Sequence, residues 1–184
     1  MTTLKALLLA TTLAATAAAT AAPLKTDPAR SSVAAVFKQM NVPVEAPFRT
    51  FAATIDYDAA RPAASKASVE IHTASFDIGD AMYNKEVAKK EWFNSAQFPK
   101  ATFVSTGITP AGAGKLNVAG KLTLKGRTAD VAFPLTVKAE GGKQVFEGQL
   151  PIRRLAFNIG EGEWKDTSMV ADEVVIKFRV TAAP

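Results

Sequence analysis

The sequence predicts an all-β fold, an eight-stranded antiparallel up-and-down barrel with a short helical insertion between strands 3 and 4. Apolar and polar side chains alternate in eight runs after residue 31, a pattern typical of half-buried strands. Short turns that contain Gly126 or Gly141 and Gly142 separate the later runs, as in hairpins. Because an open sheet exposes two strand edges, closure into a barrel is favoured, although a two-sheet sandwich also fits the pattern.

The predicted elements follow one another along the chain with short connections. The eight strands are expected at residues 32–40, 48–57, 66–73, 101–108, 114–125, 128–138, 143–152 and 172–181. Between the third and the fourth, the apolar period lengthens, and Asp80 is a suitable N-cap for a helix over residues 81–93. Since this helix has only a thin apolar stripe, we expect it to cap the sheet rather than to form core.

The first 21 residues have the pattern of a secretory signal peptide. Lys5 supplies a positive charge, an apolar stretch follows over residues 6–15, and small residues surround the expected cleavage point after Ala21. We therefore expect an exported protein in which residues 22–184 form a single domain, since about 160 residues suffice for one core and are few for two. The chain has no cysteine, which excludes disulfides, a thiol nucleophile and a cysteine-ligated metal.

The composition argues against nucleic-acid binding, catalysis and metal binding. The formal charge is +5, falling to +4 once Lys5 is removed, and the basic residues are scattered rather than gathered in a stripe. His72 is the single histidine and falls on the polar face of a strand, so we assign no catalytic residue and expect no enzyme. Glu161, Glu163 and Asp166 could only form an oxygen-ligand cation site, and a solvated acidic loop is the simpler interpretation.

Several short motifs resemble those of the YceI-like family in their order and spacing. They include Phe48-Arg49-Thr50-Phe51, Trp92-Phe93 followed by residues 98–105, residues 118–128, and Asp172-Glu173-Val174. The resemblance covers nearly the whole mature chain and implies a periplasmic, lipocalin-like barrel that binds a polyisoprenoid or isoprenoid quinone non-covalently, without a cofactor. The loop over residues 160–164 is similar to that of a subgroup associated with cytochrome b561-type membrane proteins, which implies such a partner. The oligomeric state, monomer or dimer, stays open.

The inward faces of the predicted strands would line the interior of such a barrel. In a filled barrel these residues are core, and in a hollow one they line a cavity for an apolar ligand. The expected lining residues are Phe37, Phe51, Ile55, Ile71, Phe103, Leu122, Phe133, Leu135, Phe146, Leu150, Phe157, Ile176 and Phe178. Recognition of a polar head group would then fall to residues at the mouth, for which Tyr83, Arg154 and Trp164 are the candidates.

The sequence leaves a carrier and an interaction module as the main functional hypotheses. The carrier hypothesis needs a hollow barrel that holds an isoprenoid lipid or quinone without chemistry. The second hypothesis is a periplasmic interaction module with a filled barrel, in which the loop over residues 160–166 contacts a membrane cytochrome. An enzyme is the least supported alternative, because His72 would be its only recognisable general base.

Overall fold

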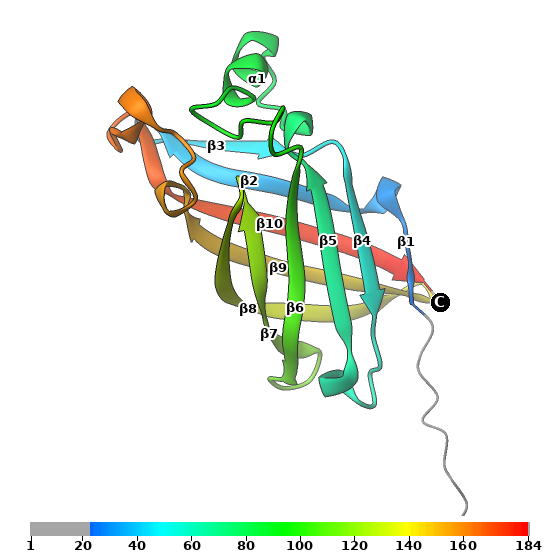
Figure 1. The fold of residues 1–184 in the computed structure, drawn as a ribbon. Coiled ribbons are helices and arrows are strands. Elements are labelled where there is room, and N and C mark those ends of the chain that lie inside the picture. The colour runs from blue at the N-terminus through cyan, green and yellow to red at the C-terminus, as the bar shows by residue number, and fades with distance from the viewer. Residues whose placement is uncertain (1–22, 184) are drawn as a thin grey trace, which may run out of the picture.

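The computed structural model describes residues 23–183, and the predicted signal peptide at residues 1–21 lies outside this range. Ten antiparallel strands form one curled sheet in the order β3-β2-β10-β9-β8-β7-β6-β5-β4, with β1 paired to β10 (Figure 1). The strands are β1 Lys25–Thr26, β2 Ser32–Gln39, β3 Val42–Pro47, β4 Phe51–Asp56, β5 Lys66–His72, β6 Lys100–Pro110, β7 Lys115–Leu124, β8 Arg127–Glu140, β9 Lys143–Arg153 and β10 Val170–Ala183. The all-β antiparallel class is confirmed, and the sheet has ten strands rather than the expected eight.

The two additional strands help to close the curled sheet. β1 extends the line of β2 along β10, and its neighbour Leu24 forms an isolated bridge to Ile55 in β4. Phe48, which follows β3 directly and precedes β4, forms a second isolated bridge to Phe76. These contacts join the first and last strands of the sheet around one apolar interior.

β3 was missed because its sequence does not look like a central strand. Pro43 and Pro47 lack the N–H that a ladder needs, and prolines are confined to edge strands, which is the place of β3 in the strand order. It is joined to β2 by a two-residue turn in which Met40 and Asn41 have φ angles of 47° and 63°. Both values match a type I′ hairpin, but this turn is usually predicted from Asn, Asp or Gly and not from methionine.

The helical insertion between the third and fourth predicted strands is present as α1, Ala81–Val87. Asp80 caps it as expected, because its carboxylate accepts hydrogen bonds from the backbone N–H groups of Met82 and Tyr83. The helix ends six residues before the predicted boundary at residue 93. After Val87 the chain turns so that Trp92 and Phe93 become buried in the core.

Short 3-10 turns fill the connections between several strands. They are η1 Pro28–Arg30, η2 Pro62–Ala64, η3 Thr73–Ser75, η4 Arg154–Phe157 and η5 Gly162–Lys165. The last two lie between β9 and β10 at the same end of the sheet as α1 (Figure 1). This end of the sheet therefore carries the longest irregular segments of the described chain.

Candidate functional site: an apolar tunnel

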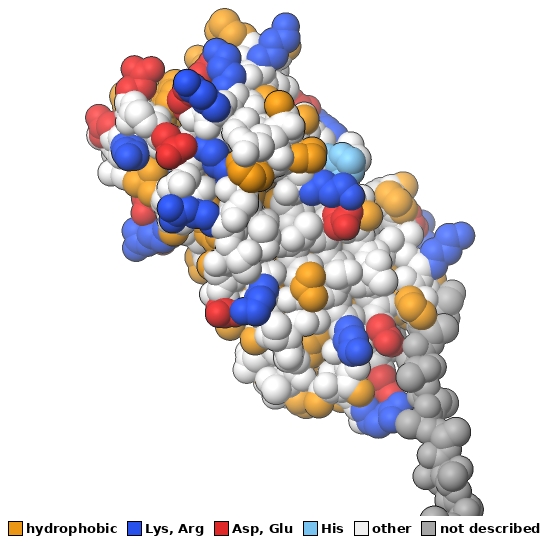
Figure 2. Space-filling view, in the orientation of Figure 1, with side chains coloured by type: hydrophobic (Ala, Val, Ile, Leu, Met, Phe, Trp, Pro, Cys, Tyr) orange, Lys and Arg blue, Asp and Glu red, His pale blue; other side chains and the backbone are white. Residues whose placement is uncertain are grey.

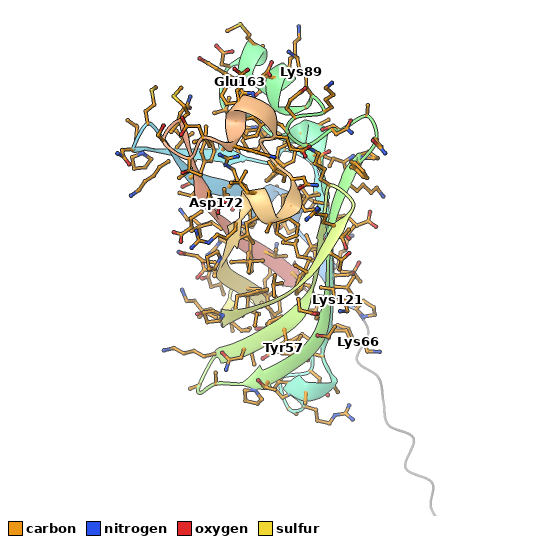
Figure 3. The ribbon with its side chains drawn as sticks, turned by 60° about the vertical axis from the view of Figure 1, so that its left-hand side comes forward. Tyr57, Lys66, Lys89, Lys121, Glu163 and Asp172 are labelled. Atoms are coloured by element: carbon orange, nitrogen blue, oxygen red, sulfur yellow. The ribbon has the colours of Figure 1, made fainter. Side chains whose placement is uncertain are left out.

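An elongated cavity runs inside the curled sheet, and we call it the tunnel. It extends from α1 and Trp164 at one end to Tyr57 and Lys66 at the other. Figure 3 shows Tyr57 and Lys66 at the opposite end of the molecule from Lys89 and Glu163. The tunnel has a volume of about 1910 Å³, including solvent at its opening. Its wall is predominantly apolar along its whole length, so it suits an apolar molecule.

Most of the predicted lining residues do line the tunnel. Eleven of the thirteen contribute to its wall, namely Phe37, Ile55, Ile71, Phe103, Leu122, Phe133, Leu135, Phe146, Leu150, Ile176 and Phe178. The other two, Phe51 and Phe157, pack in or against the core without bordering the tunnel. Phe157 lies on the 3-10 turn η4, where the alternation of a strand no longer applies, and Phe51 is the first residue of β4.

Two glycines make space for phenyl rings of the wall. A Cβ atom on Gly148 would lie 2.5 Å from Cζ of Phe178, its neighbour on β10, and one on Gly120 would lie 2.5 Å from the ring of Phe103. The rings therefore lie over the glycines, against the sheet. This arrangement keeps the bulk of both rings out of the centre of the tunnel.

Aromatic residues that the sequence analysis did not assign to the lining gather at the α1 end. The ring centroids of Phe48 and Phe76 are 5.4 Å apart, and those of Phe76 and Phe93 are 5.5 Å apart. Trp92 packs on Trp164 at 5.2 Å between ring centroids. In the sequence, the adjacent aromatic pair Trp92-Phe93 after a short helix could have indicated this aromatic cluster.

The three predicted mouth residues all border this end of the tunnel, but they differ in character. Tyr83 is 47% exposed on α1, and Trp164 is half-buried on η5. Arg154 is only 2% exposed. A side chain that is buried to this extent makes most of its contacts with the protein itself.

All five N–H donors of the Arg154 guanidinium are already used. They donate to the backbone carbonyls of Ala171 at 3.0 Å, Ile159 at 2.9 Å, Gly160 at 3.3 Å, Trp164 at 2.7 Å and Val170 at 2.7 Å. Burial lowers the pKa of Arg154, an effect that the Asp172 carboxylate opposes, and the group remains charged. Arg154 therefore fixes the connection between β9 and β10, and its role in recognising a head group stays a prediction.

The same connection is attached to the segment that carries Trp92. The N–H groups of Gly160 and Glu161 both donate to the carbonyl of Glu91 at 2.8 Å. Gly160 has a φ of +81°, and a Cβ atom there would collide with Nη1 of Arg154. Lys125 adds hydrogen bonds to the carbonyls of Lys90 and Asn158 and to the carboxylate of Glu161, whose pKa it holds below the ordinary value. Trp164 is thereby held against Trp92.

The polar residues considered for chemistry do not converge on a centre. His72 lies exposed at the end of β5, away from the buried wall. Within residues 23–183, no three His, Asp or Glu side chains come close enough to hold a metal ion. On the face shown in Figure 2, acidic and basic side chains are interspersed rather than separated. None of the helices in the described range is long and apolar enough to cross a membrane.

A curled antiparallel sheet around one apolar space is the architecture of barrels that hold a small ligand. The YceI-like domain model matches residues 24–182, and the chain belongs to this family. The crystal structure of BcnA from Burkholderia cenocepacia is 54% identical, with a TM-score of 0.84 over 86% of this chain and 100% of that chain. A UPF0312 protein of Pseudomonas savastanoi is 37% identical over 94 residues.

Two further facts set the range of these similarities. The chain spans about half the length of the first curated relatives that it matches, with 49% of the Pseudomonas savastanoi protein covered. A polyisoprenoid binding domain from Saccharophagus degradans, implicated in plant cell wall breakdown, has a TM-score of 0.68 at 16% identity over 89% of this chain and 99% of that chain. At this identity the likeness shows a shared fold.

Proposed function

We propose that the protein is a non-catalytic carrier that holds a long-chain polyisoprenoid or isoprenoid quinone in the tunnel. The observation that carries the proposal is the tunnel itself, which is long and lined by Phe, Leu, Ile and Val side chains. An isoprenoid chain is thin and has few polar atoms that would need partners inside such a wall. The polyisoprenoid binding domain with the same fold supports this choice of ligand class.

The energetics favour a long apolar ligand over a short one. A chain that buries roughly 500 Å² of apolar surface gains about 12 kcal/mol at about 25 cal/mol/Å², before the cost of association. A polar ligand of the same size would lose its hydrogen bonds to water and find few replacements in this wall.

The carrier would act outside the cytoplasm. The signal-like pattern of residues 1–21 supports export to the periplasm. A membrane cytochrome of the b561 type as partner stays a prediction from the sequence, and the oligomeric state stays open. The hypothesis of an interaction module expects a barrel filled by side chains, so a cavity of this size favours the carrier.

The first test is mass spectrometry of organic extracts from the native protein, combined with titration of the purified protein with an isoprenoid quinone. Isoprenoid in the extract or saturable binding supports the proposal. An extract without isoprenoid, together with no binding of added quinone, would refute it.

A pair of neighbouring variants on β4 locates the binding site. Ala53 borders the tunnel, whereas Ala52 is exposed on the other face of the same strand. Ala53→Phe should narrow the tunnel and weaken isoprenoid binding about tenfold or more, while the matched control Ala52→Phe stays within about twofold of wild type. Circular dichroism checks that both variants fold. Equal affinities for the two variants would place the ligand outside the tunnel.

A further inference from the structure

One buried donor at the α1 end of the tunnel is not satisfied by the protein. The Trp92 side chain is 8% exposed and borders the tunnel, and its indole Nε1–H has no hydrogen-bond partner among residues 23–183. Buried donors without a partner are rare in folded proteins, and each one calls for a physical reason. The indole nitrogen can only donate, so its complement is an acceptor atom.

The neighbours of Trp92 cannot serve as that acceptor. The Arg154 guanidinium lies 5.6 Å from the ring centroid as a cation over the aromatic face, and it carries donors only. The Trp164 ring packs against Trp92 at an interplanar angle of 53°, with 5.2 Å between the ring centroids. Both groups hold the indole in place while leaving its N–H unpaired.

The other polar side chains at this end are less suited to a buried ligand atom. The Arg154 donors are all used by backbone carbonyls, and Tyr83 is largely directed to solvent. Glu86 is paired with Lys89 at 2.5 Å. Gln39 also borders the tunnel and is only half-buried, so Trp92 is the fully buried side-chain donor without a partner in the described part of the wall.

We infer that Trp92 is the specificity-determining residue of the tunnel, donating its indole N–H to an oxygen acceptor at one end of an apolar ligand. This inference rests on the proposed carrier function and narrows the ligand class to isoprenoids with a carbonyl, phenol or similar oxygen, in preference to plain hydrocarbons. The guanidinium beside the ring also favours an electron-rich head over a cationic one. The nitrogen is not accessible in this structure, so the acceptor reaches it only after the ring of Trp92 or Trp164 rotates.

The chain has two tryptophans, so the test has a direct spectroscopic readout. In ¹⁵N-labelled protein the indole region should show two cross-peaks, and the Trp164→Phe variant leaves only that of Trp92. An isoprenoid quinone should move the Trp92 indole proton downfield, whereas an isoprenoid hydrocarbon of the same chain length should not. A single hydrogen bond predicts that Trp92→Phe weakens quinone binding about three- to tenfold and changes hydrocarbon binding by less than about twofold.

Ala52→Phe, exposed on the outer face of β4, is the control variant and should keep the preference for quinone. If Trp92→Phe weakens the binding of quinone and of hydrocarbon equally, Trp92 is a simple wall contact and the inference is overturned. Wild-type protein that binds quinone and hydrocarbon equally well, with no shift of the Trp92 signal, also overturns it while leaving the carrier function intact. Wild-type protein that binds neither ligand overturns both.

Discussion

Replacing Arg154 should destabilise the protein more than any change at an exposed arginine. Arg154→Met removes the donor of five backbone carbonyls, three in the β9–β10 connection and two at the start of β10. Hydrogen bonds to a charged group are worth about 1.5–3 kcal/mol each and are not additive, and breaking such a buried network costs about 3–5 kcal/mol. Because part of the connection can take up water, we expect about 3 kcal/mol, or a fall in Tm of roughly 6–12 °C.

Urea denaturation of wild type and variant measures this change directly. Arg153→Met is the matched control, because the Arg153 side chain is 70% exposed and lies 3.5 Å from Asp172 as a surface ion pair. Its loss should cost less than about 0.5 kcal/mol. The opposite pattern, in which Arg154→Met leaves stability within about 0.5 kcal/mol of wild type and abolishes ligand binding, would refute the structural role and restore Arg154 as a head-group contact.

Two further perturbations test the tunnel wall and the α1 end. Gly148→Ala places a Cβ atom 2.5 Å from the Phe178 ring and should push that ring into the tunnel, so a titration should show isoprenoid binding weakened about tenfold. Gly107→Ala is the control, because its Cβ atom meets open space and the variant should bind isoprenoid normally. Unchanged isoprenoid binding in Gly148→Ala would contradict this prediction. The pKa of Asp77 is lowered to about 2 by hydrogen bonds from Asn84, the Gly79 N–H and Arg49. Since the folded pKa lies below the ordinary 3.8, this carboxylate stabilises the protein above about pH 4 and loses that effect as the pH falls toward 2. Asp77→Asn should therefore flatten the fall of Tm across that interval, and an unchanged slope would speak against it.

The strands that carry the tunnel were predictable because their environment is simple. Each faces the apolar interior with alternate residues, so the period of two in the sequence indicates both the strand and its inward side. On β7, for example, the alternation places Leu116, Val118, Leu122 and Leu124 on one face, and all four border the tunnel. The bulge between Ser105 and Gly107 in the pairing of β6 with β7 leaves this face intact.

The elements that escaped prediction depend on contacts made far along the chain. β1 has two residues and gains its conformation from pairing with Ala182 and Ala183 at the other terminus. α1 was expected to continue to Phe93, because the local sequence allows it. Burial of Trp92 and Phe93 in the core ends it at Val87, and the tertiary packing outweighs helix propensity.

The polar residues of the site were the hardest to assign, because the role of a polar side chain depends on which of its hydrogen-bonding groups the rest of the protein already uses. In the connection between β9 and β10 and at the start of β10, one arginine with five donors satisfies the carbonyls of Ile159, Gly160, Trp164, Val170 and Ala171. Arg154 looked like a ligand contact in sequence and is used by the fold. Trp92 was expected on a helix that caps the sheet, and it is instead buried with an unpaired donor beside the tunnel. Because backbone carbonyls occupy the donors of the guanidinium, we infer that recognition falls to the indole beside it.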